Sequence, residues 1–295
     1  MRISQNMIFD ALQSSVQSAQ NRAFAATERA SSGRAIERFS DDPVRAASGR
    51  QHQYALDKLQ GMEKASRRIA GEQRGAANAL EETRNILVRA KEINIQGING
   101  SLSDSERQTL AAEVESMRTA ALALGNTQIG ETYIFGGNQS DQAPFASDGS
   151  YSGDAGERRV EVAPGQTVAA NIPGARAFGT GAATGDVFAA LDGLAGALQA
   201  NSPAALQDAL DALDAASGTV ADARSDIETH IKATRDADAR RESLSLELQR
   251  ARSDALEQDP VQAIMDMLEA QSSLQSAIAQ ASRIMQDRKS TRLNS

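Results

Sequence analysis

The chain has 295 residues, and only 3% of them are aromatic, which argues against one large compact core. It contains no cysteine, so disulfide bonds, cysteine metal sites and thiol catalysis are excluded. The net charge is −8, whereas general nucleic-acid binding requires a basic surface, so we do not expect nucleic acid as a partner. No apolar run approaches the roughly eighteen residues of a membrane span, so we expect no membrane insertion.

Residues 1–41 are predicted to form an N-terminal assembly arm around one amphipathic helix. Its apolar stripe begins with Ile8, Leu12 and Val16 and continues with alanines at helical spacing. Burying each of the three larger side chains contributes about 2 kcal/mol, whereas ordering each backbone residue costs about 1–2 kcal/mol. We therefore expect this arm to fray in the isolated protein and to become ordered on assembly.

A polar turn at Ser40 and Asp41 is predicted to end the arm. Asp42 follows as a helix N-cap and Pro43 as the first helical residue, where a proline loses no intrahelical hydrogen bond. An acidic functional site is the alternative interpretation of the two aspartates, but no third carboxylate or histidine lies nearby in the sequence. The turn is expected to open the first half of a helical core, residues 42–132.

Two apolar stripes run through this first half of the core. They consist of Ala76, Leu80, Thr83, Leu87 and Ala90, and of Leu110, Val114, Met117, Ala121 and Leu124. Steps of three and four residues put each set on one face of a helix, so we expect both helices to pack along a seam. Ser103, with Glu106 three residues later, predicts a capping box at the start of the second helix.

Residues 133–186 are predicted to form a β-rich outer domain, because half of the 22 glycines and five of the ten aromatic residues lie in or directly beside this island. Segments 158–165 and 166–174 are expected to pair as a β-hairpin. Gly136 and Gly137 are expected in a tight turn, since the spacing of a phosphate-binding loop is absent. The island differs so much in composition that we expect its deletion to leave a helical protein that still melts cooperatively.

Residues 187–256 are predicted to return as the second half of the helical core. A short helix with Leu191, Leu194 and Leu198 on one face comes first. The sequence Asn201-Ser202-Pro203 then interrupts the pattern and restarts a longer helix, with the proline at its first position.

Residues 257–288 are predicted to form a C-terminal assembly arm with the same period. One apolar seam is expected from Ile264, Met267, Gln271, Leu274, Ile278, Ala281 and Met285. The pattern then stops, and the basic segment 289–295 has no seam, so we expect this segment to be a non-native tail.

These patterns predict a mainly α fold, in which long, antiparallel, coiled-coil-like helices from both ends of the chain flank one β-rich insertion. The partner-binding surface is expected on the two arms, at Ile8, Leu12, Val16, Ile264, Met267, Leu274, Ile278 and Met285. No nucleophile–base pair or cofactor motif stands out, and His52 and His230 lie in charged helical stretches without other metal ligands nearby. We expect a structural protein with no catalytic residues, cofactor or metal.

Several segments together resemble the flagellin superfamily. They are Met1-Arg2-Ile3-Ser4, Ser31-Ser32-Gly33-Arg34, Phe39-Ser40-Asp41-Asp42-Pro43-Val44, and Gly130-Glu131-Thr132-Tyr133-Ile134-Phe135-Gly136-Gly137-Asn138 followed by Ala143-Pro144-Phe145. The Ser-Asp-Asp-Pro turn and the Tyr-Ile-Phe-Gly-Gly segment are similar to the hook-associated protein 3 (FlgL) branch, and filament flagellins usually lack them. The resemblance covers both ends and the entry to the island, but the short apolar tail usual in the family is missing.

The resemblance implies a rod, in which paired terminal helices form an inner tube, a helical domain surrounds it and a β-rich domain faces outward. It implies a structural subunit at the hook–filament junction of the bacterial flagellum, in contact with neighbouring copies of itself, the preceding hook-associated protein and flagellin. It also implies a secreted, extracellular location, reached through the flagellar type III channel with a cytosolic export chaperone. The first seven residues agree with export without a cleavable signal peptide, since they lack its apolar core.

Three other functions stay open at this point. A filament flagellin would be the same class of protein at a different position in the flagellum. A signalling coiled coil, such as a chemoreceptor cytoplasmic hairpin, is disfavoured by the β-rich island and by the absence of a membrane segment. A secreted binding module could use the island as an adhesin head.

Overall fold

The computed structural model describes residues 2–36, 38–99, 102–180 and 185–293. In chain order the elements are α1 (Arg2–Ser32), α2 (Pro43–Asn99), α3 (Asp104–Gly125), β1 (Gln128–Ile129), β2 (Thr132–Tyr133), β3 (Arg159–Ala163), β4 (Gln166–Ala169), α4 (Gly174–Phe178), α5 (Val187–Ala200), α6 (Pro203–Leu256) and α7 (Pro260–Leu293). The four strands form two separate two-stranded sheets. The predicted mainly α fold with one β-rich insertion is confirmed.

The chain divides into two compact units. We call Met1–Asp57 together with Ser245–Ser295 the arm unit, and Lys58–Leu244 the body unit. Both predicted arms fall in the arm unit, which also contains the start of α2 and the end of α6. The finer division of the chain into segments with separate roles in assembly stays a prediction.

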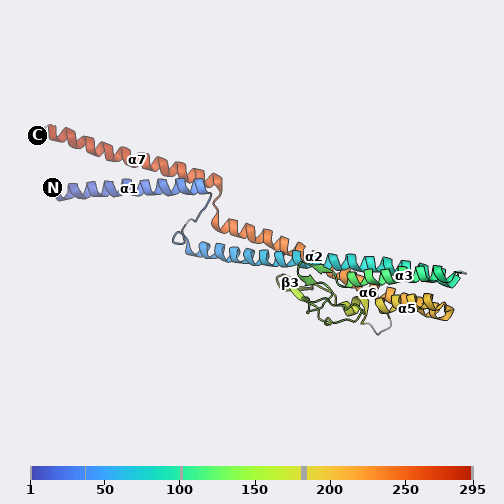
Figure 1. Cartoon of the computed structure of the whole chain (residues 1–295). Helices are drawn as coiled ribbons and strands as arrows, with labels where there is room; N and C mark the ends of the chain where they lie inside the picture. Colours follow the sequence, from blue (N-terminus) through green and yellow to red (C-terminus); the bar gives the residue numbers. More distant parts are fainter. Residues whose placement is uncertain (1, 37, 100–101, 181–184, 294–295) are drawn as a thin grey trace. The chain divides into compact units, whose positions relative to one another are not determined.

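In the arm unit, α1 and α7 run side by side, with the two ends of the chain at the same end of the pair (Figure 1). The seam between them is built largely from alanine. Ala19, Ala23 and Ala26 of α1 and Ala263 of α7 are all at least 93% buried. Alanine lets two helices approach closely, but a methyl group removes little apolar surface from water, so each seam residue contributes little stability.

The polar turn between α1 and α2 has the predicted capping role. Asp42 Oδ1 accepts the backbone N–H groups of the two residues that follow Pro43, at 3.1 and 3.0 Å, and α2 begins at that proline. Asp41 Oδ2 accepts the N–H of Arg38 at 2.9 Å, and Ser40 lies within the turn. These two carboxylates therefore stabilise the turn between α1 and α2.

The core of the body unit contains the predicted helical stripes. Leu80 and Leu87 of α2, Val114 of α3 and Leu194 of α5 have no exposed surface. The capping box at the start of α3 is present, since Ser103 N–H donates to Glu106 Oε2 at 2.8 Å and the Glu106 N–H donates to Ser103 Oγ. These hydrogen bonds hold the pKa of Glu106 below its usual value.

The break between α5 and α6 also lies where the sequence predicts it. Asn201 ends α5 in the left-handed conformation, with φ of 48°, and α6 restarts at Pro203. Along α6 the buried stripe uses Leu206 and Leu213, whereas Leu210 is only half-buried. Alanines and a valine continue the stripe, at Ala209, Ala216, Val220 and Ala223.

The island contains the predicted hairpin but has no separate core. Strands β3 and β4 pair antiparallel, with Val160 opposite Val168. The aromatic side chains of the island instead pack into the helical core of the body unit: Phe145 lies 5.0 Å from Phe188 of α5, and Phe178 is stacked on the same ring at 5.8 Å. This shared core argues against the expectation that the island could be removed without loss of cooperative folding.

The β3–β4 hairpin is fixed to α2 and α6 by buried polar groups. Gln73 of α2 is fully buried; its Nε2 donates to Ala169 O at 2.9 Å and its Oε1 accepts the hydroxyl of Thr234 at 3.1 Å. Beside it, the buried Glu72 forms an ion pair with Arg158. A buried donor or acceptor that loses its partner costs about 1–3 kcal/mol, so these contacts specify where the hairpin sits.

The two units differ sharply in the size of their buried side chains. The twelve largest fully buried side chains of the described residues, from Phe135 to Leu198 by volume, all belong to the body unit. Among the described residues of the arm unit, seven hydrophobic side chains are buried, and five of them are alanine. Stability from hydrophobic burial is therefore concentrated in the body unit, as the low apolar volume of the arms predicts.

Candidate interaction surface

Exposed hydrophobic side chains gather on the arm unit. Among the described residues, twelve of the fifteen large hydrophobic side chains that are exposed lie in this unit, although it contains fewer residues than the body unit. Single exposed apolar residues are normal on protein surfaces, but a concentration of them marks a region that contacts other molecules. The arm unit is therefore the candidate interaction surface.

On α1, the residues predicted from the apolar stripe lie at the seam with α7. Leu12 and Val16 are half-buried, and the stripe continues into the buried alanines. The side chain of Ile8 lies outside the described residues. In the isolated chain this face of α1 is thus already occupied by α7, while Phe24 projects elsewhere and is 73% exposed.

On α7, the predicted stripe is wrong as a single seam. Met267 and Leu274 are half-buried, but Ile264 and Ile278 are 49% and 45% exposed, and the predicted Gln271 is exposed as well. The side chain of Met285 lies outside the described residues. The face that packs on α1 instead alternates these larger residues with alanines, in the order Ala263, Met267, Ala270, Leu274, Ala277 and Ala281.

The remaining apolar residues at the start of α7 form a second face, which we call the outer patch. It consists of Val261, Ile264, Met265 and Leu268, each between 49% and 68% exposed. At about 3.6 residues per turn these four lie on the side of α7 opposite Ala263 and Ala270. Sequence reasoning merged the two faces, because it gave weight to large apolar residues and did not assign the alanines to the seam.

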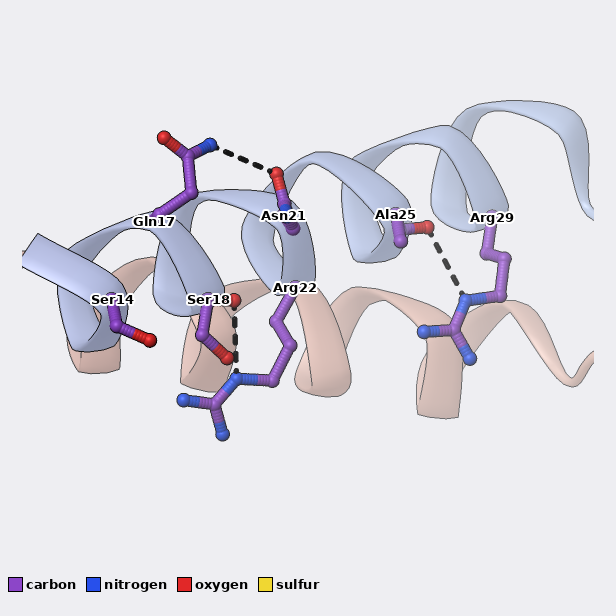
Figure 2. A pocket seen from close by; sticks show the side chains of 7 residues that line it. All are labelled: Ser14, Gln17, Ser18, Asn21, Arg22, Ala25 and Arg29. Atoms are coloured by element: carbon purple, nitrogen blue, oxygen red, sulfur yellow. Dashed lines mark hydrogen bonds between the residues drawn. The ribbon is translucent and has the colours of Figure 1, made fainter.

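An open groove of about 480 Å³ runs along the exposed side of α1 and reaches the flank of the helix pair at Arg22 and Arg29; we call it the back groove. Figure 2 shows its lining, with α7 behind α1 in this view. The lining residues are Ser14, Gln17, Ser18, Asn21, Arg22, Ala25 and Arg29. Their side chains are small or polar, and the sequence analysis did not single them out.

Two arginines give the back groove its charge. Arg22 Nε donates to Ser18 O at 3.4 Å and Arg29 Nε donates to Ala25 O at 3.2 Å, so both guanidinium groups are held along the helix surface (Figure 2). The same two arginines face Asp266 and Glu269 of α7 across a smaller groove of about 280 Å³ on the flank of the helix pair. No ion pair within 4 Å joins these four groups in the described part of the chain.

A third hollow lies between the end of α1 and the turn that follows it. It measures about 480 Å³, and Phe24 and Arg38 are among its lining residues. It shares Asn21, Ala25 and Arg29 with the back groove, so the two hollows form one continuous depression along α1.

The paired glycines of the island are used for a turn. Gly137 has φ of +72°, a conformation that favours glycine, and a side chain there would collide with Asp154. A side chain at Gly136 would collide with the backbone of Gln139. Asn138 N–H donates to Asp154 Oδ1 at 2.8 Å, so a carboxylate of the island itself uses this backbone donor.

Metal-binding clusters and membrane-spanning helices are both absent from the residues that the structure describes. No group of three or more metal-ligating side chains occurs among them, and none of their helices is long and apolar enough to cross a membrane. His230 is half-buried on α6, where desolvation lowers its pKa.

Comparison with known proteins finds similarity to flagellar proteins. A family model described as the bacterial flagellin N-terminal helical region matches residues 3–140. Flagellar hook-associated protein 3 of Escherichia coli strain K12 is 28% identical over 239 residues, which cover 78% of this chain and 71% of that protein. Flagellin B of Vibrio anguillarum is 37% identical, but over only 83 residues, or 28% of this chain.

Solved structures agree in fold. The flagellar junction protein FlgL of Legionella pneumophila superposes with a TM-score of 0.58 at 16% identity, covering 71% of this chain and all of that one. FlgL of Xanthomonas campestris gives a TM-score of 0.61 at 19% identity, covering 68% of this chain and 99% of that one. At these identities the likeness concerns the fold.

Proposed function

We propose that this chain is a flagellin-superfamily protein of the hook-associated protein 3 type and a structural subunit of the bacterial flagellum at the hook–filament junction. The observation that carries the proposal is the contrast between the two units. A body unit with all the largest buried side chains is joined to an arm unit whose seam is mostly alanine and whose bulky apolar side chains are exposed.

This contrast has a physical consequence for assembly. An alanine seam contributes little stability alone, so the arm unit gains most of its order when partners cover its exposed apolar side chains. The two ends of the chain lie together at one end of the α1–α7 pair, which lets both contribute to the same contact (Figure 1). The partner-binding residues predicted on α1 and α7 belong to this proposal.

The proposed partners are other flagellar components. They are neighbouring copies of this chain, the preceding hook-associated protein and flagellin. Delivery to the extracellular flagellum would use the flagellar type III channel and a cytosolic chaperone, without a cleavable signal peptide. A filament flagellin is the second candidate, but the flagellin match covers 28% of the chain and the hook-associated protein match covers 78%.

A charge in the α1–α7 seam tests the proposal. Leu274 is half-buried against α1, and we expect Leu274→Asp to loosen the arm, because a carboxylate in a closed assembly would cost several kcal/mol. In the source bacterium, the variant should be secreted and hooks should form, but stable filaments should be lost. The purified variant should keep the main melting transition of the wild type, since that transition belongs to the body unit.

Gln271→Asp is the matched control, because Gln271 is exposed on the same helix and the substitution adds the same charge. It should leave filaments intact. Normal filaments in a strain that lacks the gene altogether would refute the junction role. A large loss of melting temperature in purified Leu274→Asp would instead show that α7 belongs to the main folded core. Secretion is scored separately, so that a defect in export is not taken for a defect in assembly.

A further inference from the structure

We propose that His230 is a pH-sensitive latch, which holds one edge of the island against α6 at neutral pH and loosens it in acid. The inference is independent of the proposed junction role, because it concerns how the island is attached within one chain. It follows from the contacts around the His230 ring, from the charges that face the ring and from what an added proton would require there.

The ring of His230 lies where three parts of the island meet α6. Four charged side chains face it: Glu157 just before β3, Arg159 on β3, Arg176 on α4 and Asp226 one turn earlier on α6. The residue is half-buried, and its Nδ1 atom is buried without a hydrogen-bond partner among the described residues. A titratable ring therefore reaches into the contact between the island and the helix.

Both carboxylates beside the ring are already bound by Arg176. Its Nη2 lies 2.7 Å from Asp226 Oδ2, and its Nη1 lies 3.5 Å from Glu157 Oε1. One guanidinium group therefore joins α4 to α6 and to the segment that leads into β3. Any other donor at this place has to compete with Arg176 for the same two acceptors.

The backbone of His230 is held in place as well. Its carbonyl oxygen accepts the hydroxyl of Thr234 at 3.0 Å, and the same hydroxyl donates to Oε1 of Gln73 at 3.1 Å. Through Gln73, α2 contributes a neutral amide to this site. Because Gln73 and Thr234 are both buried, this part of α6 is fixed, and a new charge on the ring must be accommodated by the side chains around it.

A proton on His230 changes both the charge and the hydrogen bonding of this site. With a neutral ring, the two carboxylates and the two guanidinium groups balance, whereas an imidazolium adds an unbalanced positive charge. Both ring nitrogens of an imidazolium are donors, so the buried Nδ1–H needs an acceptor. Either a bridge of Arg176 breaks to supply one, or a buried donor stays unpaired, which is unfavourable. Both results weaken the contact of α4 and β3 with α6.

The direction of the pH effect follows from the same surroundings. Desolvation lowers the pKa of His230 below its ordinary value of 6.5, and the attraction of the two carboxylates opposes this shift without cancelling it. The released ring binds a proton more readily than the docked ring. The attachment is therefore at full strength above pH 6.5 and weakens as the pH falls from there through the pKa of the docked ring.

Hydrogen exchange tests the latch, because the chain has only two histidines. The full-length protein is measured at about pH 7 and about pH 5, with rates corrected for the intrinsic effect of pH. We expect the protection of the β3 and β4 amides to fall about tenfold in acid in the wild type. In His230→Gln, whose side chain is not protonated, it should change less than about twofold. The matched control, His52→Gln on α2, should behave as the wild type.

Arg176→Gln separates the latch from a general effect of acid. Without the competing guanidinium group, Glu157 and Asp226 can accept from the imidazolium, so NMR should show His230 titrating at a higher pH than in the wild type. The titration of His52 should not change. Equal loss of protection in the wild type and in His230→Gln, or full protection of the hairpin at about pH 5, would overturn the latch. An unshifted His230 titration in Arg176→Gln would overturn it as well.

Discussion

Asp154 shows at the scale of a single residue how the island's entry turn is held. Its Oδ1 accepts the backbone N–H groups of Asn138 and Gly156, each at 2.8 Å, and so ties the turn at Gly137 to a loop that follows much later in the chain. These hydrogen bonds stabilise the ionised carboxylate and hold its pKa below the ordinary value of 3.8.

We predict that Asp154→Asn lowers the melting temperature at neutral pH and makes the protein less sensitive to acid. The folded pKa lies below the unfolded one, so the stabilisation is complete above pH 3.8 and is lost as the pH falls from there through the folded pKa. Melting curves of both proteins between pH 7 and pH 3 should therefore converge at the acidic end. Asp141→Asn, at an exposed position of the same island, should follow the wild type. A constant difference across the whole range would contradict the prediction.

At the scale of elements, the island and the helices share one core. Phe135 and Phe178 meet edge to face at 5.0 Å, and Phe145 connects this pair to Phe188 of α5. The hairpin is held separately by Gln73 and by a small apolar cluster around Val162 and Ile69. The island thus contributes its own strands, but its aromatic side chains belong to the same core as the helices of the body unit.

We therefore predict that deleting residues 137–184 broadens or abolishes the cooperative melting transition. The deletion removes Phe145 and Phe178 and leaves Phe188 with an exposed cavity wall, and loss of one large buried aromatic side chain typically costs about 3–5 kcal/mol. Circular dichroism at increasing temperature measures the effect. Deletion of the basic segment 289–295 is the control and should leave the transition unchanged. A sharp transition after the island deletion would show that the helices have a sufficient core of their own.

At the scale of the whole molecule, stability is unequal between the two units. The body unit carries the large buried aliphatic and aromatic side chains, and the arm unit carries an alanine seam and exposed apolar groups. Regions with few buried apolar contacts open locally at a lower free energy than the global unfolding. The arms should therefore open while the body remains folded.

We predict that limited proteolysis of the purified monomer removes α1 and α7 first. The resistant fragment should contain the body unit, Lys58–Leu244, with ends that extend into α2 and α6. Mass spectrometry of the fragments over time measures the order of cleavage. Early cleavage within α3 while both ends remain intact would contradict the unequal stability of the units.

Much of the fold follows from the sequence because it depends on local rules. The capping box at Ser103, the N-cap at Asp42 and the helix restart at Pro203 each need only a few neighbouring residues, and all three are found as predicted. The heptad stripes of the body unit were also predictable. Exposing large apolar side chains such as Leu80 and Leu87 to water is costly, so the helix face that carries them is the face that is buried. The hairpin followed from its turn at Gly165, where φ is +71°.

Only the tertiary structure decided which face of α7 is covered. Alanine is neutral in an apolar stripe, so the sequence alone placed Ile264 and Ile278 in the seam, where the fold puts Ala263 and Ala277. A seam of alanines is stabilised when two helix backbones pack closely together. The distance between the two helices depends on both of them, so the sequence of one helix does not predict it. The tertiary structure also decided the role of the island. Its composition predicts a separate domain, but the contact of Phe145 with Phe188 makes it part of the core of the body unit.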